Sequence, residues 1–190
     1  MARPRQFNPD EALDSVVEVF WRRGYAATGY DELVRASGVS RKSLYATFGD
    51  KDTLFIAALR RYRATIAQSI LDDLAQTDGT PGSTGAVLAE IGEAVALLGQ
   101  GRGCLMANTA AAEATASATA QKEVHDHLEA QRAAFTKALR REGLSARRAK
   151  RLGHFATGTL QAIFLLGHAS ADRAYIDALV AEAKRTLVDR

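Results

Sequence analysis

The sequence contains only three prolines, and this scarcity constrains its fold more than any other feature. They stand at positions 4, 9 and 81, so long stretches of the 190-residue chain lack the residue that most disrupts a helix. Those stretches are rich in alanine, leucine and arginine, which favour helices. Hydrophobic residues make up 47% of the chain, which allows a sizeable core and argues against disorder. We therefore expect an all-α protein.

Helix-capping residues divide the first third of the chain into short helices. Asn8 precedes a helix that we expect to end at Gly24, and Thr28 pairs with Asp31 to open a second one. Ser40 caps a third helix, and the remaining expected segments in this region are 41–48 and 51–74. The second and third helices are joined by the tight turn "SGVS", which is the helix-turn-helix arrangement.

The third helix has the composition of a DNA-reading helix. In a helix-turn-helix the second helix of the motif enters the major groove with its N-terminal residues near the bases. Arg41 and Lys42 oppose the helix dipole in its first turn, which suits a phosphate partner. A solvated basic surface is the alternative. The predicted DNA contacts are Thr28, Tyr30, Ser40, Arg41, Lys42, Ser43, Tyr45, Thr47 and Lys51.

Charge placement points to the same end of the chain. Residues 1–63 hold eleven basic and eight acidic residues, an excess of three that equals the net charge of +3 of the whole chain. A local basic excess suits a polyanion partner, although three charges is a small difference. Arg3 and Arg5 lie in an N-terminal arm that is either inserted in a minor groove or a disordered tail.

Residues 12–59, "ALDSVVEVFWRRGYAATGYDELVRASGVSRKSLYATFGDKDTLFIAAL", resemble the TetR family of bacterial transcriptional regulators. The likeness covers the Gly-Val-Ser turn and the Leu-Tyr-x-x-Phe pattern of the third helix, and Ala46 departs from the tyrosine or histidine more usual there. Such a resemblance implies a homodimer that binds a palindromic double-stranded DNA operator through its N-terminal helices. It also implies a C-terminal domain with an effector pocket and a dimer interface, and most members are repressors released by a small molecule.

The rest of the chain predicts five more helices, which makes about nine in all. A linker at 77–85 precedes them, and the expected segments are 86–98, 104–114, 120–142, 146–168 and 172–188. We expect a DNA-binding domain at 1–50 and a ligand-binding and dimerisation domain at 51–190. Apolar positions of the last two helices are the predicted dimer interface, unless they only complete the monomer core: Leu152, Ala156, Thr159, Leu160, Ile163, Ile176, Leu179, Val180, Ala183 and Leu187.

The effector pocket is predicted on the central helices. Its candidates, each of which also suits the core, are Leu88, Ile91, Val95, Leu98, Cys104, Met106, Asn108, Phe135, Phe155 and Phe164. An apolar lining predicts a hydrophobic or aromatic effector. Cys104, the single cysteine, excludes an intrachain disulfide, and it is either a buried hydrophobe or, beside Arg102 at a helix start, a reactive thiol.

No catalytic motif is present. The sequence lacks a P-loop, a dinucleotide-binding glycine pattern and a nucleophile elbow, and His125 and His127 stand at a spacing that does not share a helix face. We predict no enzyme activity, cofactor or metal, and a cytoplasmic location without a membrane span. The leading hypothesis is a ligand-responsive repressor. The alternatives are a transcriptional activator, a nonspecific architectural protein, or a small-molecule-binding or enzymatic helical domain with a basic head.

Overall fold

The computed structural model describes residues 7–98, 101–112 and 117–188, and every regular element in these ranges is an α-helix. The expected all-α class is confirmed. The elements are α1 (Pro9–Ala27), α2 (Tyr30–Ser37), α3 (Arg41–Phe48), α4 (Lys51–Thr65), α5 (Gln68–Gln76), α6 (Ser83–Leu98), α7 (Leu105–Ala111), α8 (Ala118–Arg141), α9 (Ala146–His168) and α10 (Arg173–Val188). Across the described ranges, no helix is long and apolar enough to cross a membrane.

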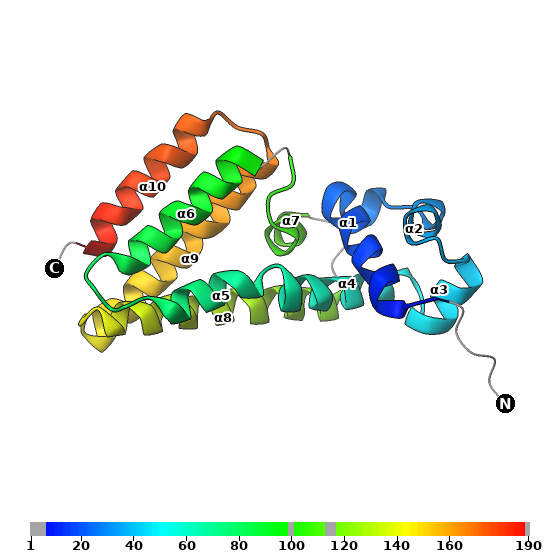
Figure 1. Cartoon of the computed structure of the whole chain (residues 1–190), viewed down its shortest axis with the longest axis horizontal. Helices are drawn as coiled ribbons and strands as arrows, with labels where there is room; N and C mark the ends of the chain where they lie inside the picture. Colours follow the sequence, from blue (N-terminus) through cyan, green and yellow to red (C-terminus); the bar gives the residue numbers. More distant parts are fainter. Residues whose placement is uncertain (1–6, 99–100, 113–116, 189–190) are drawn as a thin grey trace.

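The molecule is elongated, with two groups of helices at its ends (Figure 1). Helices α1, α2 and α3 lie at one end, and α6, α9 and α10 lie at the other. The long α8 and the successive helices α4 and α5 run between them. We call α1, α2, α3 and the first half of α4 the head. Because α4 packs against both α1 and α8, the boundary at residues 50 and 51 stays a prediction.

Capping side chains fix the helix starts in the head. Asn8, Ser40 and Asp50 each accept a hydrogen bond from a backbone N–H two or three residues ahead, at 3.0, 3.2 and 2.8 Å. The turn between α2 and α3 contains Gly38 at φ 68°, a left-handed conformation that glycine adopts without a Cβ clash. The head has its own core, in which the rings of Phe20 and Phe55 meet edge to face at 4.9 Å.

The junction of α1 and α2 differs from the prediction. The first helix does not end at Gly24 but kinks there, at φ 71° and ψ 172°, and continues to Ala27. Thr28 does not cap α2, because its hydroxyl donates back to the Gly24 carbonyl at 2.7 Å. Gly29 is the N-cap residue, and its N–H donates to the Glu32 carboxylate at 3.2 Å.

The predicted fourth helix is divided in two. The N–H groups of Ile66 and Ala67 both donate to the Tyr62 carbonyl, at 2.9 and 3.0 Å, so the second bond spans five residues and widens the turn. The Thr65 hydroxyl also donates to the Arg61 carbonyl one turn earlier, a contact that often bends helices. Helix α4 therefore ends at Thr65, and α5 starts at Gln68.

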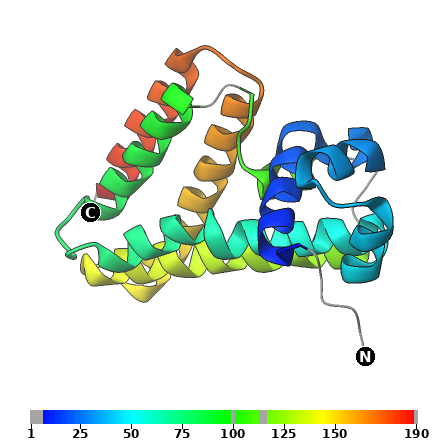
Figure 2. The same cartoon turned by 45° about the vertical axis from the view of Figure 1, so that its right-hand side comes forward.

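The remaining predicted segments correspond to α6 to α10. Helix α9 has the predicted bounds, and each of the other four is shifted at one end or both. Helix α6 begins at Ser83 rather than 86, because the buried Glu142 carboxylate accepts from the N–H groups of Gly82 and Thr84 at 2.9 and 2.7 Å. The α8–α9 hairpin packs closely at Gly153, where a Cβ would lie 2.3 Å from the Thr136 hydroxyl. Turning the molecule by 45° again shows α6 and α10 side by side (Figure 2).

Candidate nucleic-acid interface and effector cavity

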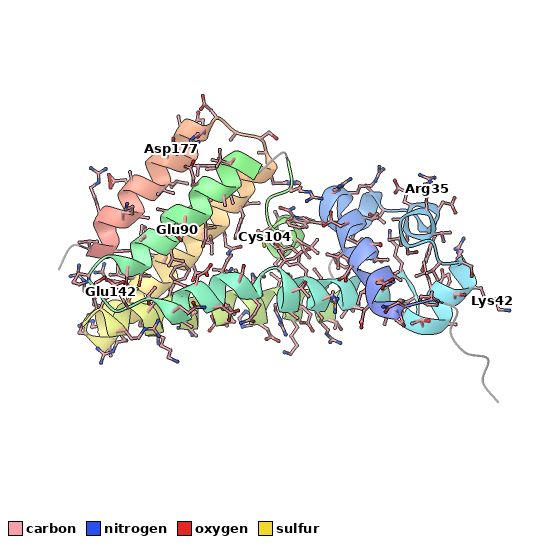
Figure 3. All side chains as sticks on the ribbon, in the orientation of Figure 1. Arg35, Lys42, Glu90, Cys104, Glu142 and Asp177 are labelled. Carbon is pink, nitrogen blue, oxygen red and sulfur yellow. The ribbon has the colours of Figure 1, made fainter. Side chains whose placement is uncertain are left out.

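Helix α3 presents two cations at the outer end of the head. Leu44 is buried and anchors the helix, while Arg41 and Lys42 in its first turn are exposed. Figure 3 shows Lys42 at the extreme end of the molecule, directed outward. Within the described ranges, neither cation forms an ion pair with a carboxylate. Two unneutralised cations on one exposed helix end are suited to a phosphate backbone.

Arg41 is held by two aromatic rings. The rings of Tyr30 and Tyr45 stack at 4.8 Å between centroids, and the Arg41 guanidinium lies 4.5 Å from the first and 5.6 Å from the second. Burial, and then the hydrogen bond with Tyr45, raises the pKa of Tyr30 to about 12, so its hydroxyl stays protonated. The arrangement limits the rotamers of Arg41. The sequence predicted these three residues as separate contacts and did not reveal that they form one unit.

The other predicted DNA contacts are in mixed settings. Lys51, at the start of α4, places its ammonium 4.4 Å from the centre of the Tyr25 ring. Ser43 receives the hydrogen bond of the Ser40 hydroxyl at 3.0 Å. Thr28 is buried and its hydroxyl is engaged within the backbone, which argues against the predicted phosphate contact.

Thr47 is half-buried on α3, and Arg3 and Arg5 lie outside the described residues. Arg35 was not predicted from the sequence. It is exposed at the end of α2 and labelled in Figure 3 on the same end of the molecule as Lys42. Arg35 is one of the eleven basic residues among the first 63, and that count was the available signal.

A cavity of about 410 Å³ lies where α4, α5 and α6 meet α8, α9 and the loop before α7. Its walls are mostly apolar, and its volume is in the usual range for small-molecule sites. Four predicted pocket residues line it: Ile91, Val95, Cys104 and Phe164. Figure 3 labels Glu90 and Cys104, which line the cavity from α6 and from the residue before α7.

The other predicted pocket residues lie elsewhere. Leu88, Met106 and Phe135 are fully buried in the core. Asn108 donates to the Arg102 carbonyl at 2.8 Å but does not line the cavity. The prediction for Phe155 is corrected, because its side chain is 39% exposed on the outer face of α9. The side chain of Leu98 lies outside the described part of the structure.

Two buried polar residues line the cavity from α8, and neither was predicted from the sequence as a pocket residue. His127 is fully buried, and neither of its ring nitrogens has a hydrogen-bond partner among the described residues. Burial, and then the charge of Arg63, lowers the pKa of His127 to about 4, so the ring is neutral at pH 7. Gln131, one turn on, accepts from the Gln161 side chain at 2.8 Å, and its own NH₂ group has no partner. The spacing of four residues between them places both on one face of a helix, and this was the signal available in the sequence.

Cys104 does not have the environment of a reactive thiol. It is 2% exposed, and burial raises its pKa, which opposes formation of the thiolate. Arg102, expected to lower that pKa, instead pairs with Glu18 and lies over the Trp21 ring at 5.0 Å. The geometry therefore favours the buried-hydrophobe interpretation.

Trp21 brings the head into contact with the cavity. Although it belongs to α1, it lines the cavity, and its indole N–H donates to the carbonyls of Arg102 and Gly103 at 3.1 and 3.2 Å. Its ring also meets Tyr62 of α4 edge to face at 5.0 Å. A molecule in the cavity would therefore touch a side chain of the head.

Most of the predicted interface residues complete the core of the single chain. Eight are buried within it: Leu152, Ala156, Thr159, Leu160, Ile163, Ile176, Ala183 and Leu187. Leu179 and Val180 are half-buried. The opposite faces carry exposed apolar side chains instead, with Phe155 at 39%, Leu165 at 40% and Tyr175 at 64%. Between the first two, a Cβ added at Gly158 would meet nothing within 4 Å. We call Phe155, Gly158, Leu165 and Tyr175 the outer stripe.

The sequence of the head matches a known family of regulatory proteins. Residues 12–58 match the family model described as "Bacterial regulatory proteins, tetR family". The transcriptional repressor ComR of Escherichia coli (strain K12) is 47% identical over 60 residues, which cover 32% of this chain and 29% of ComR. The transcriptional activator FasR of Mycolicibacterium smegmatis is 35% identical over 74 residues, 39% of this chain and 34% of FasR. The chain spans between 29% and 50% of the length of the curated relatives that it matches.

A solved structure is similar over nearly the whole chain. The regulator CifR, in a cysteine-substituted form bound to a 26-base-pair double-stranded operator, superposes with a TM-score of 0.84 and 26% sequence identity. The likeness covers 96% of this chain and 98% of that one. It therefore includes both the head and the helices around the cavity.

Proposed function

Because this chain belongs to the TetR family of bacterial regulatory proteins, we propose that it binds a palindromic DNA operator as a homodimer and represses transcription until a small molecule releases it. TetR family members are regulators rather than enzymes, and on that ground the prediction of no enzyme activity is confirmed. The observation that carries the proposal is the unit of Tyr30, Arg41 and Tyr45 on a capped α3. Beside it stands Lys42, which forms no ion pair with any residue that the structure describes. A cytoplasmic location follows from a DNA partner.

Support for DNA binding comes from the organisation of α3. An arginine stacked on aromatic rings loses little rotamer freedom when it binds, so its guanidinium is ready to meet a guanine edge or a phosphate. Lys42 has no such restraint and suits the phosphate backbone as a mobile charge. The cysteine-substituted CifR supports the same role, since its structure contains operator DNA.

Support for a homodimer comes from the outer stripe. Its apolar side chains are exposed in the single chain, and Gly158 allows another backbone to approach closely. A second copy that packs α9 and α10 against the same helices would bury the stripe in a four-helix interface. The eight residues buried in the protomer would then support this interface from behind.

Support for release by a small molecule comes from the position of the cavity. Its wall includes Tyr62 of α4 and Trp21 of α1, so a ligand contacts both a helix of the head and the helix that connects the head to the rest of the chain. A ligand that fits only one position of the head would weaken operator binding, and DNA would weaken ligand binding by the same factor.

The test begins with a footprint of the purified full chain on the DNA that flanks its own coding region. Fluorescence anisotropy then compares the wild type with Lys42→Ala and Tyr45→Ala. Both should weaken binding, and Lys42→Ala should reduce the slope of log K against log salt by about 2, because each of the two protomers loses one phosphate contact. Lys137→Ala, which removes an exposed cation from α8, is the matched control.

Three outcomes would contradict parts of this function. Unchanged affinity in both head variants would show that α3 is not the reading helix. Sedimentation of the chain as a monomer, alone and on DNA, would exclude the homodimer. Transcription from a template carrying the footprint should fall when the protein is added, and a rise would instead indicate an activator, as FasR is described to be.

A further inference from the structure

We propose that the cavity binds a hydrophobic organic cation, a molecule with an apolar, aromatic body and a protonated amine, and that it excludes organic anions. The inference rests on the proposed function, because it treats the cavity as the effector site. It is drawn from three parts of the cavity wall: polar groups without partners at the inner end, two carboxylates on α5 and α6, and an arginine that is already neutralised.

The inner end contains polar atoms that lack hydrogen bonds. Across the described residues, both ring nitrogens of His127 and the NH₂ group of Gln131 have no partner, and both side chains are fully buried. An unsatisfied buried polar group costs roughly 1–3 kcal/mol, so such groups are usually paired with protein, water or ligand. A neutral imidazole offers one donor and one acceptor, and the amide adds a donor. These atoms suit an uncharged polar group of a ligand, such as a carbonyl, sulfonyl or ether.

Two carboxylates stand at the exposed side of the cavity. Asp73 on α5 and Glu90 on α6 both line it, and both are exposed. No ion pair or hydrogen bond joins either carboxylate to another described residue. Arg141 of α8 reaches α5 beside Asp73, but it donates to the Leu74 carbonyl and does not line the cavity. Their field therefore favours a positive group and opposes a negative one at the point where a ligand enters.

Arg102, the one cation among the described residues of the wall, does not offset this field. Arg102 is paired with Glu18 of α1 and stacked on Trp21, so its charge is already compensated. Arg63, which acts on His127 from α4, does not line the cavity and shares the Glu123 carboxylate with Arg60, at 3.1 and 2.7 Å. In the described wall, an anionic ligand would meet two carboxylates and a single arginine that is already paired. A cationic one would meet complementary charge without breaking an existing ion pair.

The middle of the cavity accepts an aromatic body. Trp21, Tyr62 and Phe164 contribute ring surfaces, and Ile91 and Val95 complete an apolar wall of α6. The volume of about 410 Å³ fits a single bicyclic ring system with a short chain. A ligand with its polar linker near Gln131 and its amine near Glu90 would use every part of the wall.

Two fluorescent probes of matched length test the charge. Dansylcadaverine ends in a primary ammonium, and dansyl-6-aminohexanoate ends in a carboxylate; both carry the same aromatic group and sulfonamide. Trp21 is the only tryptophan and lies in the cavity wall, so energy transfer from Trp21 to the dansyl group reports binding there. The full-length protein is titrated without DNA. We expect the cation to bind at least about tenfold more tightly, equivalent to about 1.4 kcal/mol.

Substitutions assign the effect to the wall. The double change Asp73→Asn and Glu90→Gln should abolish the preference for the cation, whereas Asp72→Asn, on the same helix but not in the wall, should retain it. Gln131→Leu should weaken both probes equally, because both carry the sulfonamide. Ala94→Phe, which fills the cavity, should abolish energy transfer from both.

The outcomes separate this inference from the proposed function. Equal binding, preference for the anion, or no energy transfer with either probe would overturn the ligand class, whatever the DNA experiments show. Retention of the preference in the Asp73 and Glu90 double variant would also overturn it. If the cation binds as expected but the protein has no footprint on DNA, the ligand class stands and the proposed repressor function fails.

Discussion

Replacement of His127 by leucine should make the stability of this protein less sensitive to acid. The buried imidazole has a pKa of about 4 in the folded chain, against an ordinary value of 6.5. As the pH falls below 6.5, His127 is protonated in the unfolded chain but stays neutral in the folded chain until about pH 4. The free energy of unfolding that is present above pH 6.5 therefore decreases between pH 6.5 and pH 4. The complete shift corresponds to about 3 kcal/mol, and at pH 5 about 2 kcal/mol of it is lost.

The measurement is urea unfolding at pH 7.5 and pH 5.0, followed by circular dichroism at fixed protein concentration. The wild type also loses stability through its carboxylates, so the informative quantity is the difference between proteins. His127→Leu should lose about 2 kcal/mol less than the wild type between the two pH values. It should be no less stable at pH 7.5, because leucine removes two buried ring nitrogens that have no partner.

The matched control is His125→Leu, which removes an exposed imidazole two residues away on the same helix. It should keep the acid sensitivity of the wild type. If His127→Leu and the wild type lose the same free energy between pH 7.5 and pH 5.0, then the ring is not held neutral by burial. That result would refute the statement that burial and the charge of Arg63 lower the pKa of His127.

Two further predictions concern assembly and release. Phe155→Glu should convert the dimer to monomers in analytical ultracentrifugation, with little change in the melting curve of the protomer. The control Leu97→Glu, at a more exposed apolar residue of α6, should leave the dimer intact. If the Phe155 variant remains a dimer, the outer stripe is not the interface. Trp21→Phe removes the hydrogen bonds to the carbonyls of Arg102 and Gly103. Operator affinity should persist, while dansylcadaverine should release DNA at least about fivefold less effectively in anisotropy titrations. Unchanged release would show that ligand binding and DNA binding are not coupled through this contact.

Three of the four helix starts in the head, those of α1, α3 and α4, were readable from the sequence because their causes are local. Ser40 caps α3 by accepting a hydrogen bond from an N–H three residues away, and Gly38 supplies the left-handed turn before it. Both partners of each interaction therefore lie within a few residues of each other in the sequence. The kink at Gly24 was not readable in the same way. Glycine is compatible with a helix end or a kink, and the bond from Thr28 back to Gly24 selects the second.

The cavity and the outer stripe depend on distant contacts, and there the sequence was a weaker guide. Helix α9 has apolar residues around much of its circumference, so periodicity alone did not decide that Leu160 faces inward and Phe155 outward. His127 and Gln131 are polar, and a pattern that assigns polar residues to the surface overlooks a buried pair. Trp21 had the spacing of a core residue of the head, and only the packing of α7 against α1 places it beside the cavity.

The widened turn after Tyr62 gives the molecule a mechanical property. Helix α4 has 15 residues and is about 22 Å long, so a rotation of about 5° at residues 66 and 67 would move its far end by about 2 Å. Two such arms in a symmetric pair would change the span between their tips by up to twice that amount. A side chain that stiffens the turn would thus set which separation of half-sites is tolerated, without altering a single atom that touches a base.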